Sequence, residues 1–465
     1  MSDKFADSDL RLKLALNMQG AKLDDIRGNL TIDSLRFTHS DQAFSMPHLE
    51  LMAEVSEPEY EGKVRQQQLR HLSISSDYIN ARLWGAFSYS ELPAAVLRLV
   101  ASALPNVFTD EQERELKRHT SQTDLEFYIY LKNLNELCSI LGLPVVPYGT
   151  STIKGSIAEQ TQSHVAHVLE TGYGQPHNCL FQAHFPLLTL SGNTIENLTL
   201  SFDNATQEKD GQLRLLLKGL THSSATPAGE HIGELQLRLD ARARHDSLDL
   251  QLDWGNVHDT AMHHTGDLHV TTTLARYAGK PLISATIHPA TFIFADSTWT
   301  LGSARIAFAA ADTVVQVEDF RLSSGQQLIY ANGIVAPLHS DSIYAELKNI
   351  NLDYLLGALT DVHQAIYFGG TVTGWAKGYG ILRNPMFEAD VEMLNGSING
   401  SLLGDVYARA RFDRENKKVV IDGDAYDHRL HPNAHVVHVD GEVKSHGLWD
   451  LDIRADSVEI GLVNH

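Results

Sequence analysis

The sequence predicts a mainly β protein, an elongated antiparallel sheet with one apolar face and a few short helices. The first observation is that leucine occupies every second position of three segments, while the positions between are mostly charged or amide residues. This two-residue period is typical of strands with one dry and one solvated face. The leucines are Leu213, Leu215 and Leu217, then Leu235, Leu237 and Leu239, then Leu248, Leu250 and Leu252, with Trp254 in step.

The second observation is that strand patterns follow one another with Gly, Asn, Asp and Pro between them, as in antiparallel meanders. Parallel βαβ units would need a helix after each strand, and the sequence lacks them. The clearest expected strands are Gly28–Phe37, Ile195–Phe202, Leu282–Phe294, Arg305–Val317, Asp390–Asn399 and Val436–Val443.

Helices are expected at only a few places. Apolar residues at helical spacing predict one from about Glu91 to Leu104, and the charged stretch Asp110–His119 suggests a second, exposed helix. Two short helices are expected at 131–141 and 351–359. They belong to a repeat, because Leu131–Ala158 resembles Leu347–Gly378, and recurring units of strands plus a helix favour an extended architecture. We expect an N-terminal β segment with helical insertions over 1–160 and a continuous β segment over 161–465, together forming one elongated unit.

Composition restricts the partners. With 37 Lys plus Arg against 58 Asp plus Glu, the formal charge of -21 argues against nucleic acid and against attachment to anionic lipid head groups. The two cysteines, Cys138 and Cys179, show no metal-binding or disulfide spacing. No stretch approaches the roughly 20 apolar residues that span a bilayer. Both ends look like cuts within a longer protein.

Catalytic and metal-binding patterns are not found. The sequence has no nucleophile elbow, no HExxH and no phosphate-binding glycine loop, so we expect neither an enzyme nor a cofactor. The pairs His164/His167 and His435/His438 are three residues apart, and such positions point to opposite faces of a strand. No metal site is therefore expected there, nor at His263 and His264.

The apolar face must be covered, and the sequence leaves two ways open. A second sheet would give an ordinary sandwich core. Alternatively, one long sheet bent into a trough would offer its face to lipid acyl chains, at about 0.8 kcal/mol for each buried CH₂.

The C-terminal half resembles the TamB and AsmA-like proteins of the Gram-negative envelope, in particular the long TamB-type proteins of Bacteroidota. The resemblance rests on the order and spacing of generic β patterns from about Leu282 to the end, and covers the first half only in style. The segments that carry it are Trp299–Phe308, Val315–Val335, Leu347–Leu359, Phe368–Val391 and Asn399–Gly423. Glu318, Asp319 and Phe320 depart mildly from the family's turn pattern.

The resemblance implies a β-taco, a curled sheet with a continuous hydrophobic groove that carries phospholipid across the periplasm for outer-membrane biogenesis. The three leucine segments and Trp254 would line this groove. An outer-membrane barrel assembly protein is an implied partner, and membrane contact is expected through parts absent from this chain, including an inner-membrane anchor. Two other classes remain open: a chaperone or scaffold that offers edge strands to barrel clients, and a hydrolase on a β scaffold, which would need a polar pocket.

Overall fold

The computed structural model describes most of the chain, and its strands and helices divide into two compact units. Unit 1 comprises Met1–His222 and Gln236–Leu250, and unit 2 comprises Ser223–Leu235 and Gln251–His465. The described residues are 8–39, 42–56, 60–61, 64–65, 68–118, 123–132, 134–141, 143–158, 179–190, 193–204, 212–222, 234–257, 263–294, 296–337, 341–352, 368–382, 386–398, 401–413, 418–427, 435–444 and 448–455. The sequence-based boundary at residue 160 lies outside them.

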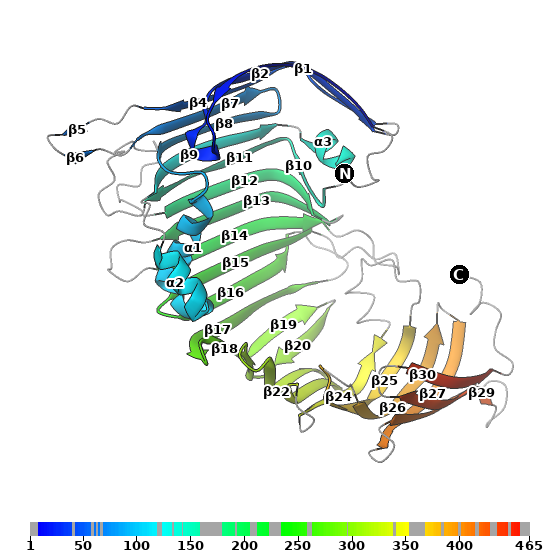
Figure 1. Cartoon of the computed structure of the whole chain (residues 1–465). Coiled ribbons are helices and arrows are strands. Elements are labelled where there is room, and N and C mark those ends of the chain that lie inside the picture. Colours follow the sequence, from blue (N-terminus) through cyan, green and yellow to red (C-terminus); the bar gives the residue numbers. More distant parts are fainter. Residues whose placement is uncertain are drawn as a thin grey trace. The chain divides into compact units, whose positions relative to one another are not determined.

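The predicted fold class is confirmed, because the described chain is mainly β, with long antiparallel sheet and few helices (Figure 1). The first sixteen strands are β1 Ser8–Gln19, β2 Arg27–His39, β3 Gln42–Met46, β4 Leu49–Val55, β5 Tyr60–Glu61, β6 Val64–Arg65, β7 Arg70–Ser76, β8 Ile79–Ala86, β9 Asp124–Lys132, β10 Val145–Tyr148, β11 Thr150–Ala158, β12 Cys179–Leu190, β13 Asn193–Asn204, β14 Gln212–His222, β15 Glu234–Arg244 and β16 Ser247–Asn256.

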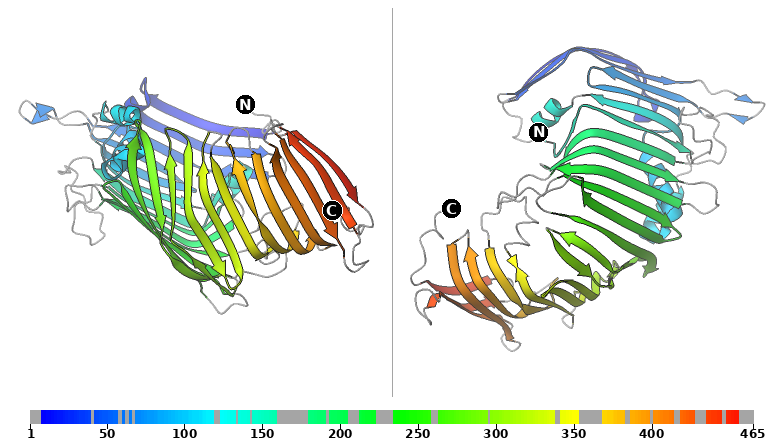
Figure 2. Two further views of the ribbon diagram at one scale, coloured as in Figure 1. Left: turned by 90° about the horizontal axis from the view of Figure 1, so that it is seen from below. Right: turned by 180° about the vertical axis from the view of Figure 1, so that it is seen from behind.

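The remaining strands belong to unit 2, where from β22 onward each pairs with the next strand in the chain (Figure 2). They are β17 Thr265–Tyr277, β18 Lys280–Ile287, β19 Ala290–Phe294, β20 Ser297–Leu301, β21 Ala304–Ala309, β22 Val314–Ser324, β23 Gln327–Val335, β24 Ser342–Asn351, β25 Phe368–Tyr379, β26 Met386–Ile398, β27 Ser401–Asp413, β28 Lys418–Tyr426, β29 His435–Lys444 and β30 Leu448–Ala455.

Each unit has a simple ladder of antiparallel neighbours. In unit 1 the pairings run β1-β2-β4-β7-β8-β9-β11-β12-β13-β14, while β3 pairs with the end of β2 and β10 with the end of β12. In unit 2 they run β17-β18-β21-β22-β23-β24-β25-β26-β27-β28-β29-β30, with the hairpin β19-β20 joined to β17 and β22.

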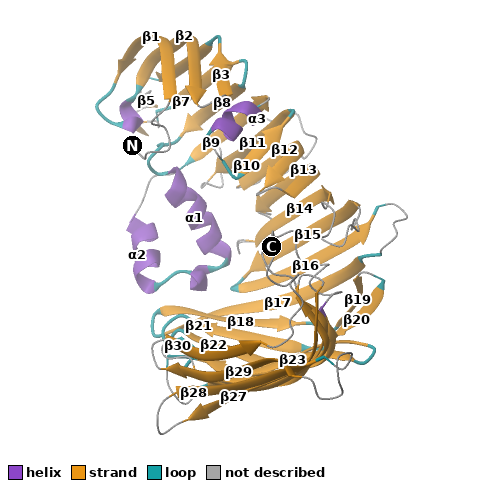
Figure 3. Ribbon diagram, turned by 90° about the vertical axis from the view of Figure 1, so that its right-hand side faces the viewer, coloured by secondary structure: helices purple, strands orange, loops and turns teal. Residues whose placement is uncertain are grey.

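Three α-helices are present in the described part: α1 Leu92–Ala103, α2 Asp110–Arg118 and α3 Asn135–Ile140 (Figure 3). Two short 3-10 turns, Leu23–Asp25 and Pro105–Val107, accompany them. The first two helices lie where the sequence predicts them. The third begins later than expected, because Leu131 and Lys132 extend β9 and pair with β11. The expected helix at 351–359 lies almost entirely outside the described residues.

Two expected strands are each divided into two. The Leu282–Phe294 pattern breaks between β18 and β19, where Pro289 has no N–H to give to a ladder. The Arg305–Val317 pattern breaks at a turn between β21 and β22, with Thr313 at a φ of 56°. No described helix is long and apolar enough to cross a membrane.

Candidate functional site

An uninterrupted row of aliphatic side chains crosses the ten-strand ladder of unit 1. Residues directly opposite each other in an antiparallel pair point to the same face of the sheet, so the registers define which side chains align. From β1 to β14 the row reads Leu16, Leu30, Leu51, Ile74, Ala81, Ile129, Ile153, Ala183, Leu200 and Leu217. Nine spacings of about 4.8 Å give the row a length on the order of 40 Å.

A second apolar row lies beside the first on the same face, two residues further along each strand. It reads Met18, Gly28, Ala53, Leu72, Leu83, Phe127, Gly155, Phe181, Phe202 and Leu215. We call the whole side of the sheet on which these two rows lie the apolar face of unit 1. All twenty positions are apolar, and sequence reasoning identified only Leu215 and Leu217 among them.

The positions between the two rows point to the opposite, polar face. They are Asn17, Asn29, Met52, Ser73, Arg82, Tyr128, Lys154, Gln182, Ser201 and Leu216. The sheet of unit 1 is therefore two-sided, with one face suited to hydrocarbon and the other to water.

The apolar face is half-exposed rather than enclosed. Small residues such as Ala81 and Ala183 are buried by their larger neighbours, but most of the leucines and isoleucines of the rows are only partly buried. At the β1 edge Leu16 is 61% exposed. Among the described residues of unit 1, the strands contact mainly their ladder neighbours, and no second sheet packs on this face.

Helix α1 covers one long edge of the apolar face of unit 1. Its Leu99 packs against Ile157 of β11, Cys179 of β12 and Phe202 of β13. Burial raises the pKa of the Cys179 thiol to about 12, with a smaller effect from the charge of Asp203. The helix buries Ala95, Leu99 and Ala103 on the side that meets the sheet, so it is a fixed border of this face.

Helix α3 covers the other edge. Its Ile140 and Leu137 pack with Phe44 and Met46 of β3, and this cluster includes Ile32 and Leu49 from β2 and β4. Ile32 and Leu49 lie on the apolar face, since they are paired with each other and stand two positions from Leu30 and Leu51. Between the two borders the rows stay accessible, and this open strip is the candidate functional site.

Of the predicted groove residues, the β14 leucines lie on the apolar face of unit 1. Leu215 pairs with Phe202 and Leu217 with Leu200, and both leucines are half-exposed. Leu213 pairs with Asn204 in the same ladder, but its side chain is outside the described part.

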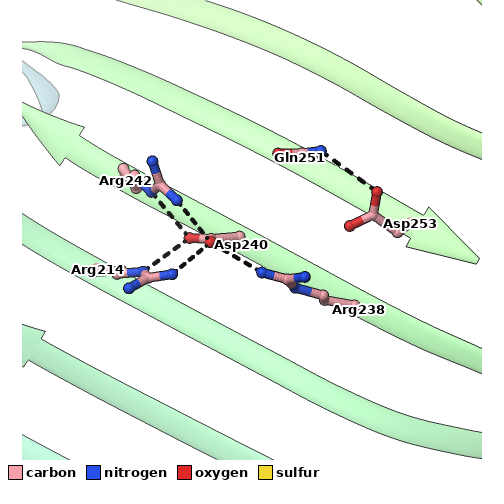
Figure 4. Close-up of polar contacts among 6 residues, drawn as sticks. All are labelled: Arg214, Arg238, Asp240, Arg242, Gln251 and Asp253. Carbon is pink, nitrogen blue, oxygen red and sulfur yellow. Dashed lines mark hydrogen bonds and ion pairs between the residues drawn. The ribbon is translucent and has the colours of Figure 1, made fainter.

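Asp240 shows which way the β15 leucines point. Its buried carboxylate, with a side chain 4% exposed, accepts hydrogen bonds from Arg214 of β14 at 3.1 and 2.7 Å (Figure 4). Arg214 lies on the polar face, because Leu215 beside it lies on the apolar one. Asp240 is therefore on the polar face, and Leu237 and Leu239, at odd positions of the same strand, point to the apolar side.

Three guanidinium groups surround Asp240. Arg242 donates to the carboxylate at 3.3 and 3.0 Å, and Arg238 has a nitrogen 3.8 Å from it. The hydrogen bond from Arg214 lowers the pKa of Asp240 from 3.8 to about 2, and Arg242 adds to this effect. The ion pairs tie β14 to β15 from the polar side, directly behind the leucines.

The first half of β16 alternates, with Leu248 and Leu250 less exposed than the intervening Asp249 and Gln251, whereas every position from Leu252 to Asn256 is half-exposed. In unit 2, Leu235 and Leu252 are also half-exposed. Trp254 packs against Phe292 with ring centroids 5.6 Å apart. A Cβ on Gly266 would lie 2.6 Å from Trp254, so this glycine lets the indole approach β17.

Unit 2 carries an apolar face of its own. From β22 to β30 one row reads Phe320, Ala331, Ala345, Ala376, Ala389, Ala410, Ile421, Gly441 and Leu451, and the next reads Leu322, Ile329, Leu347, Gly374, Val391, Ala408, Gly423, Val439 and Ile453. The row between them points to the other face and reads Arg321, Tyr330, Glu346, Trp375, Asp390, Arg409, Asp422, Asp440 and Asp452. Unit 2 therefore repeats the two-sided design of unit 1, with smaller side chains on its apolar face.

The described histidines and carboxylates form no second candidate site in the part of the chain that the structure describes. No group of three or more His, Cys, Asp or Glu side chains there could hold a metal ion. His438 and His263 instead make ion pairs with Asp424 and Asp296 at 2.8 and 2.7 Å. The pair His164/His167 lies outside the described part, as does the side chain of His435.

Comparisons with protein-family models, curated proteins and solved structures give no match.

Proposed function

We propose that this protein binds lipid acyl chains on its apolar faces and conducts phospholipid along them without catalysis. The observation that carries the proposal is that the twenty positions of the two unit 1 rows are all apolar, half-exposed for the most part, and bordered by helices. A 16-carbon chain with half of its surface buried there would gain on the order of 6 kcal/mol. That is enough to hold a lipid and still allow it to move.

The biological setting belongs to the same proposal. We place the chain in the TamB and AsmA-like family, acting in the periplasm in outer-membrane biogenesis as part of an inner-membrane-anchored protein. An outer-membrane barrel assembly protein is the proposed partner. The two-sided sheets support this assignment, because a trough needs one face for hydrocarbon and one for water, and the acidic composition keeps the outer face solvated.

Site-specific crosslinking tests the proposal on neighbouring residues of one strand. A photoreactive group at Leu200, on the apolar face, should capture phospholipid, and the same group at Ser201, on the polar face, should not. The pair Leu237 and Arg238 gives a second comparison on β15. Equal labelling of both faces would show that lipid does not bind specifically to the apolar face.

Lipid content provides an independent measurement. Mass spectrometry of the purified chain should find phospholipid, and Leu200→Glu should lower its amount, because a carboxylate would be desolvated beneath the acyl chain. Ser201→Glu is the matched control, since it adds the same charge one residue away on the solvated face.

A second candidate function, assembly of β-barrel clients, is favoured by strand β1. Among the described residues β1 pairs only with β2, so its other edge offers free backbone groups over Ser8–Gln19. Its leucines are unusually exposed, with Leu10 at 58% and Leu16 at 61%. A long apolar edge strand can add a strand from another chain. Binding of unfolded barrel segments without lipid uptake would favour this function over transport.

A further inference from the structure

The polar face of unit 1 is hollowed over β7, β8 and β9. A cavity of about 650 Å³ lies there, within the range of small-molecule sites. Its lining includes Trp84, Tyr128, Tyr130, Arg82, Asn80 and His71. These side chains stand at alternate positions of three neighbouring strands, on the side of the sheet opposite the apolar rows.

Three aromatic rings occupy positions where the alternation calls for polar residues. Tyr128 and Tyr130 form an edge-to-face pair with ring centroids 4.3 Å apart, and the Tyr128 hydroxyl donates a hydrogen bond to that of Tyr130. Both tyrosines and Trp84 are half-exposed, so each ring keeps an accessible surface. Ring faces are negative and attract the C–H bonds of a saccharide stacked on them.

Several of the polar groups around these rings donate hydrogen bonds. Neither Arg82, exposed at the cleft, nor Lys154, directly across from Tyr128 on β11, has an ion pair among the described residues. The side-chain carbonyl of Asn80 accepts a hydrogen bond from the backbone N–H of Ser76 at 3.3 Å. The NH₂ group of the same amide therefore points away from Ser76 and can donate to a ligand. Trp84 adds an indole N–H, which can only donate. Donors of this kind select an acceptor-rich, negatively charged ligand.

The cleft continues into a larger space. A neighbouring cavity of about 1000 Å³ shares His71 and Trp84 with it and reaches Arg27 at the start of β2. Its lining also includes Arg70, whose guanidinium already donates to the carbonyls of Phe87 and Asp24. Two carboxylates border this path: Glu54 lies 3.7 Å from the His71 ring in the larger cavity, and the buried Glu126 stands opposite Trp84 on β9. The two cavities together can hold more than one ring unit, in a chain whose net charge would otherwise repel anions.

We propose that this cleft binds an anionic saccharide, with Trp84, Tyr128 and Tyr130 stacking on sugar rings and Arg82 pairing with a carboxylate. Lys154, beside the cleft on β11, would pair with a second carboxylate. The site is separate from the proposed lipid function, because it lies on the opposite face of the sheet. It requires no conformational change and no catalysis.

Calorimetric titration of the full chain with trigalacturonate tests the proposal. We expect a dissociation constant of about 1 mM or tighter, and binding at least tenfold weaker for the neutral trimethyl ester, which keeps the sugar skeleton and removes its charge. Arg82→Gln should weaken trigalacturonate binding at least tenfold, and Trp84→Leu should weaken both saccharides. Arg36→Gln removes an exposed arginine on β2, away from the cleft, and should change nothing.

Several results would overturn the proposal. The first two are that trigalacturonate does not bind, or that its methyl ester binds equally well. The third is that Arg82→Gln and Arg36→Gln lose the same affinity for trigalacturonate. The fourth is that adenosine monophosphate binds more tightly than trigalacturonate, which would assign the rings to a nucleobase. Lipid content of Arg82→Gln should equal that of the unchanged chain. The proposals of a saccharide site and of a lipid groove are therefore tested independently.

Discussion

Replacing Asp240 by Asn tests how β14 and β15 are held together on the polar face. The substitution keeps the size of the side chain but leaves Arg214, Arg238 and Arg242 without their shared carboxylate. The pKa of Asp240 falls from 3.8 to about 2 in the folded chain. At about 1.36 kcal/mol per pKa unit this corresponds to roughly 2 kcal/mol, which solvent screening of the half-exposed arginines reduces to about 1 to 2 kcal/mol.

The pH dependence has a definite sign. A carboxylate whose folded pKa is depressed stabilises the fold fully above its unfolded pKa, and the stabilisation is lost as the pH falls through the folded pKa. The contribution of Asp240 should therefore disappear between about pH 4 and pH 2. The Asn variant should lack this dependence and resemble the acid form of the unchanged chain at every pH.

Amide hydrogen exchange of β14 and β15 is the assay, because a chain of two units need not unfold in one step. Asp240→Asn should lower protection in these strands and leave β28 and β29 unchanged. Asp253→Asn is the control, since within the described part of the chain Asp253 makes only a 3.5 Å contact with Gln251. Unaltered protection in Asp240→Asn, or an equal loss in the control, would refute the reasoning.

Three further predictions concern other parts of the chain. Gly28→Ala should destabilise the β1-β2 ladder by about 2 kcal/mol or more, measured by exchange, because Gly28 has a φ of +124° and a Cβ there would lie 2.0 Å from the Asn17 carbonyl oxygen. Leu99→Ala should loosen α1 and increase the alkylation rate of Cys179, measured peptide by peptide. The pKa of His438, raised by its hydrogen bond to Asp424, should fall toward 6.5 in Asp424→Asn by NMR titration. The stabilisation from this pair is present below the unfolded pKa of His438 and is lost as the pH rises through the folded one.

Each of these has a matched comparison. Gly423→Ala should be tolerated, because a Cβ there meets nothing closer than 3.5 Å. Val96→Ala changes an exposed position of α1 and should leave the reactivity of Cys179 as it was. Asp440→Asn removes the weaker, 3.4 Å partner of His438 and should shift its pKa less than Asp424→Asn does. If a comparison variant had a larger effect than the variant it is matched to, the role assigned to the corresponding contact would be wrong.

The sequence predicts the antiparallel β class and the face of the leucine strands, because both follow from local alternation. It does not predict which strands stand opposite each other. The rows of unit 1 depend on registers that loops and bulges set, such as the shifts at Lys13/Leu14 and Glu196/Thr199. A slip of one residue at either place would move a whole strand's apolar set to the other face.

The aromatic cleft is a second feature that the sequence alone does not predict. Trp84 and Tyr128 are far apart in sequence and meet only because β8 pairs with β9. A signal was nevertheless present, since large aromatic rings stand at the solvated positions of two alternating strands. Aromatic residues at solvated positions do not contribute to a core, so their presence there indicates a binding cleft on the polar face.

The rows of the apolar face of unit 1 run across the strands rather than along them. A hydrocarbon chain sliding along a row in the proposed function would meet a new apolar residue every 4.8 Å or so, about one step per strand. It would leave one contact only as it made the next, so sliding along the face would cost less free energy than leaving it. The slow steps of such a device would lie at its two ends, where a lipid enters and where it departs.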